Sequence, residues 1–392
     1  MPKKTVRDVD VAGRRVLVRV DFNVPLEEGR ITDDRRIREA LPTITHLAER
    51  GARVILCSHL GRPKGRVVDG LRLAPVAVRL GELLGRPVRQ VREVVGPEVA
   101  TAVATMRPGE ILLLENLRFH PGEEANDPDF ARQLAALADL YVNDAFGTAH
   151  RAHASTVGVA QHLPAVAGLL MEKELHHLGA ILDHPARPFV ALLGGKKVGD
   201  KIPVIRHLLG KADALLLGGA MSYTFLRARG LQVGRSLVEA ELVELAGELM
   251  AQAARREVTL ALPVDVVVAP SPEGGPTRVV PAEAIPPEWM GVDIGPRTRE
   301  QFAHLIGGAG TIFWNGPMGI FEVEDFAQGT WAVARALAES SAVTVVGGGD
   351  TAAAVEAAGV ADRITHISTG GGASLEFMEG KVLPGVAVLE DC

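Results

Sequence analysis

Short apolar runs alternate with amphipathic segments along the first part of the chain. The runs 14–20 (RRVLVRV), 52–58 (ARVILCS) and 109–117 (GEILLLENL) are bounded by turn residues. Stretches with helical periodicity, such as 34–51 and 73–85, lie between them. Nearly continuous apolar strands separated by helices are typical of a parallel sheet covered on both faces. The pattern therefore predicts an α/β fold for this part of the chain.

The same alternation starts again after Ser155. Further apolar runs lie at 187–195, 212–219, 258–269, 310–316, 341–349 and 363–372. We interpret them as a second doubly wound unit. Between the two parts, apolar residues from Val166 to Leu182 keep helical spacing until Pro185 and Pro188. These positions predict a connecting helix within residues 165–188.

Composition excludes several classes of protein. The chain has 392 residues, 47% of them hydrophobic and 23% charged, which is enough for two globular domains and argues against disorder. Two cysteines give no disulfide framework and no Cys-based zinc site, which fits a reducing compartment. There is no long apolar span and no signal peptide pattern at the N-terminus. We expect a cytoplasmic protein that does not bind membranes.

Charge is unevenly distributed about Ser155. Up to that residue there are 24 Lys and Arg against 21 Asp and Glu, and beyond it 18 against 27. This small basic excess, with 4% aromatic residues, does not indicate nucleic-acid binding. It is compatible with a small anionic ligand on the first part.

Glycine-rich turns end four apolar runs of the second part. They are Gly194–Gly195, Gly218–Gly219, Gly347–Gly349 and Gly370–Gly372. In open α/β sheets, ligands bind beyond the carboxyl ends of the strands, where glycines let backbone amides approach a phosphate. Four such turns in one unit predict a nucleotide or phosphate site.

Standard nucleotide motifs do not fit these turns. GGKKVGDKI (194–202) has the glycine spacing of a P-loop but lacks its Lys-Ser/Thr pair. Gly347, Gly349 and Ala352 match a dinucleotide fingerprint, but the following strand does not end in the acidic residue that would hold a ribose. A NAD-dependent dehydrogenase therefore stays as an alternative only. A third of the nine lysines, Lys196, Lys197 and Lys201, cluster in this segment, which favours a phosphate-binding role.

Basic residues follow the strands of the first part in the same manner. Arg36, His59, Arg62, Arg118 and Arg151 each come after an apolar run, so the topology can bring them to one sheet edge. Guanidinium groups match phosphate and carboxylate oxygens. We expect a pocket for a small polyanion there, with Asp21 and Asn23 orienting a hydroxyl or carboxylate.

From end to end the chain resembles phosphoglycerate kinase. The motifs that carry the resemblance are RVDFNVP, SHLGRP, ENLRFHPGEE, NDAFGTAHRAH, GGKKVGDKI, NGPMGIFE, GGGDTAAA and STGGGASLEFMEGKVLPG, in the family's order. The resemblance implies two Rossmann-like three-layer α/β domains with parallel sheets facing across a cleft, joined by the connecting helix. Residues 1–170 would bind phosphoglycerate, with residues 380–392 packing back on them, and residues 171–379 would bind the nucleotide.

The resemblance also implies an activity and its site residues. The activity is the reversible transfer of the acyl phosphate of 1,3-bisphosphoglycerate to MgADP, giving 3-phosphoglycerate and MgATP in glycolysis, by a hinge-bending monomer. Substrate binding falls to Asp21, Phe22, Asn23, Arg36, His59, Leu60, Gly61, Arg62, Arg118 and Arg151. Nucleotide binding falls to Lys201, Gly291, Glu322, Gly348, Gly349, Asp350 and Thr351, with Asp350 also at Mg²⁺. Catalytic roles fall to Arg36, Lys197, Gly371 and Gly372.

One position in the lysine cluster departs from the family pattern. Lys196 stands where the family commonly has Ala, so register assigns the catalytic role to Lys197 and leaves open whether Lys196 shares it. A second alternative is a non-catalytic two-domain protein that binds anions. A coupled assay with 3-phosphoglycerate and MgATP would separate this and the dehydrogenase from a kinase.

Overall fold

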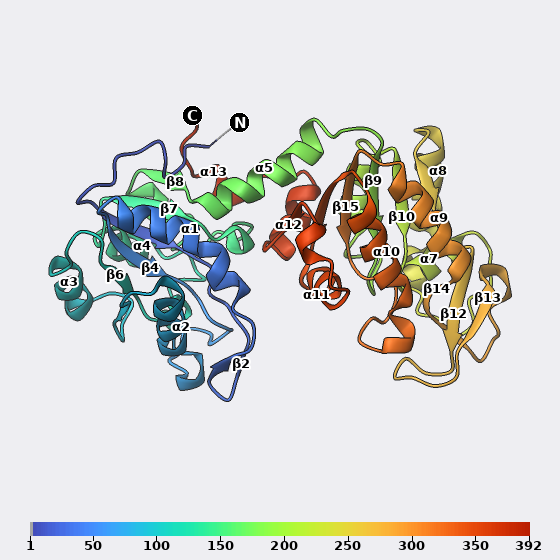
Figure 1. The fold of residues 1–392 in the computed structure, drawn as a ribbon, viewed down its shortest axis with the longest axis horizontal. Coiled ribbons are helices and arrows are strands. Elements are labelled where there is room, and N and C mark those ends of the chain that lie inside the picture. The colour runs from blue at the N-terminus through green and yellow to red at the C-terminus, as the bar shows by residue number, and fades with distance from the viewer. Residues whose placement is uncertain (1–2) are drawn as a thin grey trace. The chain divides into compact units, whose positions relative to one another are not determined.

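A computed structural model describes residues 3–392. The chain forms two compact units (Figure 1). Unit 1 extends to His176 and also contains Val382–Cys392, whereas unit 2 is His177–Lys381. The first division lies inside helix α5 (Leu169–Asp183). Among the described residues, no helix is both long and apolar enough to cross a bilayer.

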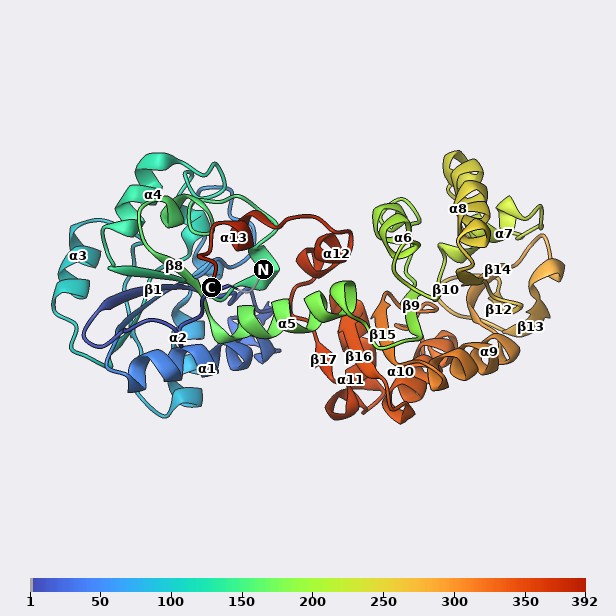
Figure 2. The same ribbon diagram turned by 90° about the horizontal axis from the view of Figure 1, so that it is seen from above.

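Unit 1 is built around a six-stranded parallel sheet in the order β5-β6-β4-β1-β7-β8. Its strands are β1 (Arg15–Arg19), β4 (Arg53–Cys57), β5 (Arg89–Gln90), β6 (Ile111–Leu113), β7 (Leu140–Asn143) and β8 (Ala165–Ala167). A hairpin of β2 (Leu26–Glu27) and β3 (Arg30–Ile31) follows β1. The helices are α1 (Arg35–Glu49), α2 (Ala74–Leu84), α3 (Pro97–Ala104), α4 (Pro128–Ala135) and α13 (Pro384–Ala387). In Figure 2, α1 and α2 lie on one face of the sheet and α4 on the other, which gives three layers.

Unit 2 has a second six-stranded parallel sheet in the order β11-β10-β9-β15-β16-β17. Its strands are β9 (Phe189–Leu193), β10 (Ala214–Leu217), β11 (Thr259–Ala261), β15 (Thr311–Asn315), β16 (Val343–Gly347) and β17 (His366–Ile367). The helices are α6 (Ile202–Leu208), α7 (Ser222–Ala228), α8 (Val243–Arg255), α9 (Pro296–Gly307), α10 (Gln328–Glu339), α11 (Gly349–Ala357) and α12 (Gly372–Met378). In Figure 2, α6 and α8 lie on one face and α9, α10 and α11 on the other.

The central strands explain the continuous apolar runs of the sequence. All five residues of β9 and of β15 are buried, because helices cover both faces of the sheet. Alternate residues of the central strands pack into one apolar cluster in each unit, with Val16, Val18 and Val54 in unit 1 and Val190, Ile312 and Trp314 in unit 2. The parallel sheets of the predicted α/β fold are confirmed.

Two details of the predicted organisation are wrong. Val166 lies in β8, and the connecting helix begins only at Leu169, since the short apolar run 165–167 pairs with β7 as a strand. Unit 2 also contains an antiparallel sheet, β13 (Arg278–Pro281), β12 (Asp265–Ala269) and β14 (Met290–Ile294). The run 258–269, interpreted as one segment, is split between this sheet and β11.

The C-terminal residues contact strands and loops of unit 1. The Lys4 amide donates to the Glu390 carbonyl at 2.9 Å, and the Glu390 amide donates to the Ala165 carbonyl at 2.9 Å. The Gly385 amide donates to the Ala149 carbonyl at 2.8 Å. Backbone hydrogen bonds thus attach this last segment to β8 and to the loop after β7.

Candidate functional site

In unit 1, the predicted basic residues follow adjacent strands at one sheet edge. Asp21 follows β1, His59 follows β4, Arg118 follows β6 and Arg151 follows β7, and these strands are neighbours in the order β6-β4-β1-β7. Because the strands are parallel, their carboxyl ends lie on the same edge of the sheet. The topology therefore brings these segments together as expected.

Hydrogen bonds connect several of these segments directly. Arg36, in the first turn of α1, donates from Nη1 to Asp21 Oδ2 at 2.6 Å. Asn23 Oδ1 accepts from the Gly61 amide at 2.8 Å, and Arg118 Nη1 donates to the Gly61 carbonyl at 2.9 Å. Gly61 thus lies at the centre of an ordered polar cluster.

The basic residues at this edge differ in how much of each side chain is exposed to solvent. Arg118 and His59 are each 4% exposed, whereas Arg62 and Arg151 are exposed. Burial lowers the pKa of Arg118, and it holds the pKa of His59 well below its ordinary value, with Arg19 and Arg118 adding to the effect. Burial would raise the pKa of Asp21, but the charges of Arg36 and Arg19 and the hydrogen bond from the Asn23 amide outweigh it, and the pKa is lowered. The edge is therefore basic around one ionised carboxylate.

Phe22 and Leu60 differ from the other predicted substrate-binding residues. Both side chains are buried in the apolar core of unit 1. The Phe22 amide donates to Ser58 Oγ at 2.8 Å, and the Leu60 amide donates to Asn116 Oδ1 at 3.2 Å. Their side chains pack in the core beneath the loops that carry the polar residues, and they offer no polar group to a ligand.

Asn116 is a positioning residue that the sequence interpretation missed. Its Nδ2 donates to the carbonyls of Leu60 and Leu71 at 2.7 and 2.9 Å, and its Oδ1 accepts from the Arg118 amide at 3.1 Å. An Asn directly after an apolar strand, two residues before a candidate Arg, was the available signal. It fixes the loops that carry His59, Arg62 and Arg118.

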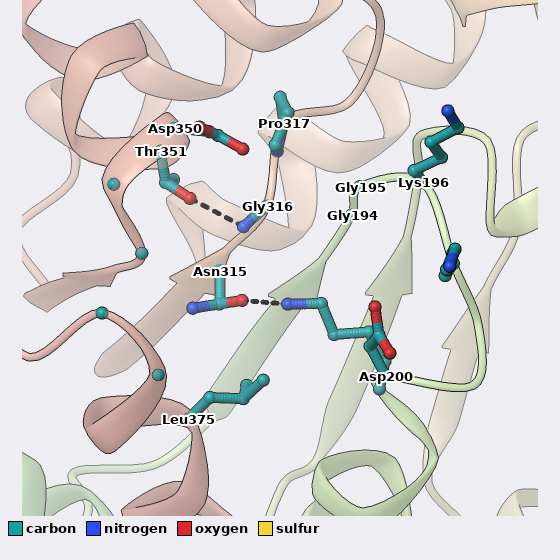
Figure 3. A pocket seen from close by; sticks show the side chains of 16 residues that line it. Gly194, Gly195, Lys196, Asp200, Asn315, Gly316, Pro317, Asp350, Thr351 and Leu375 are labelled. Atoms are coloured by element: carbon teal, nitrogen blue, oxygen red, sulfur yellow. Dashed lines mark hydrogen bonds between the residues drawn. The ribbon is translucent and has the colours of Figure 1, made fainter. Parts of the chain in front are cut away.

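Unit 2 contains a pocket of about 510 Å³ at the carboxyl ends of β9, β15, β16 and β17 (Figure 3). Its lining includes predicted residues of both the catalytic and the nucleotide-binding group. These are Lys197, Lys201, Gly348, Gly349, Asp350, Thr351, Gly371 and Gly372. The remaining lining residues are Gly194, Gly195, Lys196, Asp200, Asn315, Gly316, Pro317 and Leu375.

Close backbone approach requires glycine at the end of β9. A Cβ on Gly194 would lie 2.1 Å from the Pro317 carbonyl oxygen and 2.6 Å from that of Gly316. The Gly195 amide donates to the Pro317 carbonyl at 3.0 Å. Gly194 therefore lets the lysine loop lie directly against the Gly316–Pro317 turn.

Lys201 is the most buried of the pocket's lysines. Its ammonium group donates to Asn315 Oδ1, at the end of β15 (Figure 3). Burial lowers the pKa of Lys201 to about 8, with Asp200, Asp350 and Glu379 acting in the opposite direction. Lys196 and Lys197 are exposed at the pocket. The pocket thus combines one desolvated cation with two exposed ones.

Two helices begin at the pocket. Gly348, with φ of +93°, precedes α11, and Gly371, with φ of +53°, precedes α12. Thr351 Oγ1 accepts from the Gly316 amide at 2.7 Å, which attaches the first turn of α11 to the Gly316–Pro317 turn (Figure 3). Unpaired amides at a helix start favour an anion.

Three predicted elements lie outside this pocket's lining. Gly291 is in β14, where an added Cβ would lie 1.8 Å from the Tyr223 hydroxyl oxygen. Glu322 is exposed in the loop after β15. The Gly218–Gly219 turn packs against Met318, Gly195 and Pro317 instead of lining the pocket. The Asn315–Pro317 turn is the lining segment that the glycine pattern did not single out.

Glu239 is a further residue that sequence interpretation missed. Its Oε2 accepts from the amides of Val198 and Gly199, the latter at 3.2 Å, so it holds the loop that carries Lys197 and Lys201. The Glu239 amide in turn donates to Thr224 Oγ1 at 3.1 Å. No motif marked this Glu, because it lies some forty residues from the loop along the chain.

Comparisons with known proteins show the family of the chain. The family model for phosphoglycerate kinase matches residues 6–381. The chain belongs to the phosphoglycerate kinase family. It is 62% identical to a phosphoglycerate kinase of Pelotomaculum thermopropionicum and 61% identical to one of Moorella thermoacetica, over 100% of each chain.

Solved phosphoglycerate kinase structures share the fold. The structure of the Coxiella burnetii enzyme has a TM-score of 0.91 at 42% identity, covering 99% of this chain and 98% of that one. The Pyrococcus horikoshii enzyme has a TM-score of 0.87 at 34% identity, with the same coverage. The family resemblance seen in the sequence is thus confirmed, and so is the α/β fold class.

Proposed function

We propose that this protein catalyses the reversible transfer of the acyl phosphate of 1,3-bisphosphoglycerate to MgADP, giving 3-phosphoglycerate and MgATP in glycolysis. The observation that carries the proposal is the unit 2 pocket, where three lysines and two glycine-led helix starts meet in a chain of the phosphoglycerate kinase family. A phosphotransferase that uses a nucleotide requires this combination of backbone amides and mobile cations.

Unit 1 is the proposed site of the acid substrate. Arg62 and Arg151 are exposed and available to phosphate or carboxylate oxygens. The Arg36 side chain is one-third exposed, and its ion pair with Asp21 already restricts its conformations. Contact with a reacting group therefore costs little further side-chain entropy. Asp21, Asn23, Gly61 and Arg118 form the ordered base of the site.

Unit 2 is the proposed nucleotide site. Lys201 neutralises nucleotide phosphate, and the amides at Gly348–Thr351 and Gly371–Gly372 face its oxygens. Lys197 contacts the phosphoryl group during transfer, because a flexible ammonium can follow a moving charge. Gly291 and Glu322 remain proposed contacts to the base and ribose.

The residues at the pocket fit a magnesium ion that arrives with the nucleotide. Among residues 3–392, no cluster of three His, Cys, Asp or Glu side chains could hold a metal alone. Mg²⁺ is commonly bound by one or two carboxylates together with substrate phosphates, and Asp350 at the pocket supplies one carboxylate. When bound, the ion neutralises phosphate charge.

The chemistry follows from charge stabilisation more than from proton transfer. The attacking groups, a nucleotide phosphate in one direction and a carboxylate in the other, are ionised at neutral pH, so no general base is required. What the residues must stabilise is the negative charge on the phosphoryl group during transfer. Arg36 and Lys197 are the proposed catalytic cations, with Gly371 and Gly372 supplying backbone amides.

The test is a coupled assay in which 3-phosphoglycerate and MgATP are the only substrates offered to the protein. No NAD is supplied as a substrate, so a dehydrogenase would show no turnover. We expect turnover in wild type and a loss of about 100- to 1000-fold in Arg36→Ala. Arg38→Ala is the matched control, since Arg38 is half exposed and pairs only with Asp34 among the described contacts. Absence of turnover in wild type, or equal turnover in the two variants, contradicts the proposal.

Several finer points remain predictions. The monomeric state and the domain boundaries at residues 170 and 380 are proposed from the family resemblance, and the cytoplasmic location from the composition of the chain. Gel filtration with light scattering measures the first of these directly.

A further inference from the structure

A buried charged network lies beneath the proposed substrate edge of unit 1, and none of its three members is a predicted site residue. Arg19 and Glu123 are both fully buried, and Ser155 lies between them. Arg19 Nε donates to Ser155 Oγ at 2.8 Å, and Ser155 Oγ donates to Glu123 Oε1 at 2.5 Å. The Ser155 amide donates to Glu123 Oε2 at 3.0 Å. Hydrogen bonds compensate for the burial of charged groups in folded proteins, and Ser155 supplies such bonds to both side chains.

The network joins three chain segments that carry proposed substrate contacts. Arg19 ends β1, just before Asp21. Glu123 follows the loop of Arg118, and Ser155 follows the loop of Arg151. Tyr141, on β7, donates from its hydroxyl to the Ser155 carbonyl at 2.7 Å and so fixes that position further. Ser155, which accepts from Arg19 Nε, is therefore itself held by Glu123 and Tyr141.

The consequence for the site is carried by His59. Arg19 Nη2 lies 3.2 Å from His59 Nδ1. A guanidinium group has five N–H donors and no acceptor, so Nδ1 must be the acceptor in this contact. A ring that accepts at Nδ1 carries its proton on Nε2 when neutral. Protonation of Nδ1 would place two donors against each other.

We propose that Glu123, Ser155 and Arg19 are positioning residues that hold His59 as the neutral tautomer with its proton on Nε2, so that the ring binds the anionic substrate as a hydrogen-bond donor and not as a cation. The role at the substrate rests on the proposed function, whereas the tautomer does not. The charged groups that act on His59 are Arg19, Arg36 and Arg118, which disfavour its protonation, and Asp21, which favours it. Burial of the ring acts with the three arginines.

The arrangement has a physical advantage over a protonated His59. The proposed substrate edge already has exposed Arg62 and Arg151 to supply charge. A neutral donor keeps its direction and its charge unchanged across the pH range in which free histidine titrates, near pH 6.5. The contact to substrate would then be independent of pH.

The first test measures the tautomer in the whole protein without substrate, by NMR of ring-¹⁵N-labelled histidine. The His59 signals are assigned by their loss in His59→Gln. We expect Nε2 to be protonated and Nδ1 unprotonated from about pH 8 down to about pH 5, below the ordinary pKa. A His59 ring that carries its proton on Nδ1, or that titrates near pH 6.5, overturns the proposal.

The second test removes the bridge between Arg19 and Glu123. Ser155→Ala is expected to raise KM for 3-phosphoglycerate about ten-fold, as loss of a hydrogen bond to a charged group predicts, with KM for MgATP unchanged. It is also expected to mix the tautomers of His59. Ser155→Thr keeps the hydroxyl and is expected to restore both values.

Glu123→Gln is a second variant that disturbs the network. The Ser155 amide and hydroxyl both donate to Glu123, so the NH2 group of a Gln side chain would face one of these two donors. It is compared with Glu98→Gln on the exposed first turn of α3. A Ser155→Ala variant that folds and keeps the wild-type KM and tautomer contradicts the positioning role. An inactive protein with the expected tautomer would instead refute only the proposed function.

Discussion

The two proposed binding sites occupy equivalent places in their sheets but present different chemistry. Unit 1 offers side chains, chiefly guanidinium groups, of which that of Arg36 donates to Asp21 and that of Arg118 donates to the Gly61 carbonyl. Unit 2 offers backbone amides and glycines, with lysines as its cations. The carboxyl ends of parallel strands can thus bind one ligand through guanidinium groups and another through backbone N–H dipoles.

The difference explains the uneven charge of the chain. Residues after Ser155 carry 18 basic against 27 acidic residues, which would repel a nucleotide if net charge decided its binding. At the pocket itself, three lysines stand against Asp200 and Asp350. We therefore expect local dipoles and close cations to outweigh the acidic excess of residues 156–392 in nucleotide binding.

The largest expected effect tests which exposed lysine acts in unit 2. Lys197→Ala should lower kcat by about 100- to 1000-fold with a small change in KM, since the cation acts on transferring charge. Lys196→Ala, one residue away and also exposed at the pocket, is expected to keep kcat within about three-fold. Steady-state kinetics of both variants in the coupled assay measure this. A reversed order would move the role to Lys196.

The next effect tests whether unit 2 depends on backbone approach. Gly194→Ala places a methyl group against the carbonyls of Pro317 and Gly316, which should cost about 1–3 kcal/mol in the free energy of unfolding. MgADP affinity should fall by about ten-fold as the lysine loop moves away. Urea unfolding and calorimetry measure the two quantities.

Gly247→Ala is the matched control in helix α8. There an added Cβ meets only Ala228 Cβ at 4.0 Å, so this variant is expected to gain about 0.5–1 kcal/mol from helix propensity. Unchanged stability and affinity in Gly194→Ala would show that the pocket does not require this approach.

A smaller effect follows from the pKa of Lys201, which burial lowers to about 8. In the free protein Lys201 loses its proton as the pH rises through 8, and only the charged form attracts phosphate. KM for MgATP should therefore rise up to about ten-fold between about pH 7 and pH 9. Lys201→Arg stays charged over this range and should flatten the profile. A pH-independent KM in wild type would contradict the assigned role of Lys201.

The smallest effect separates the two modes of recognition by salt. Between about 0.05 and 0.5 M NaCl, screening shortens the reach of exposed charges from roughly 14 to 4 Å. We expect KM for 3-phosphoglycerate to rise about five-fold, because Arg62 and Arg151 are exposed. KM for MgATP should rise only about two-fold, because the cation assigned to its phosphates, Lys201, is desolvated and backbone amides supply the other contacts. Sucrose at matched osmolality is the control. Equal salt dependence of both substrates would remove the distinction between the sites.

The alternation of apolar runs and helical segments determined the α/β class, because strands buried on both faces must be apolar throughout. The order of motifs determined the family, and glycines and basic residues after strands marked both candidate edges. Sequence patterns are local, however, and they placed Val166 in a helix where pairing with β7 makes it a strand.

Only the tertiary structure decided which side chains meet. Glu239 and the Arg19–Ser155–Glu123 network join segments that lie far apart along the chain, so no spacing could reveal them. The structure also showed that Gly218 and Gly219 serve packing, although their sequence context equals that of the pocket glycines. Glycine is required at a strand end where a neighbouring segment approaches its Cα, as the Gly316–Pro317 turn approaches Gly194, and only the tertiary structure brings that segment there.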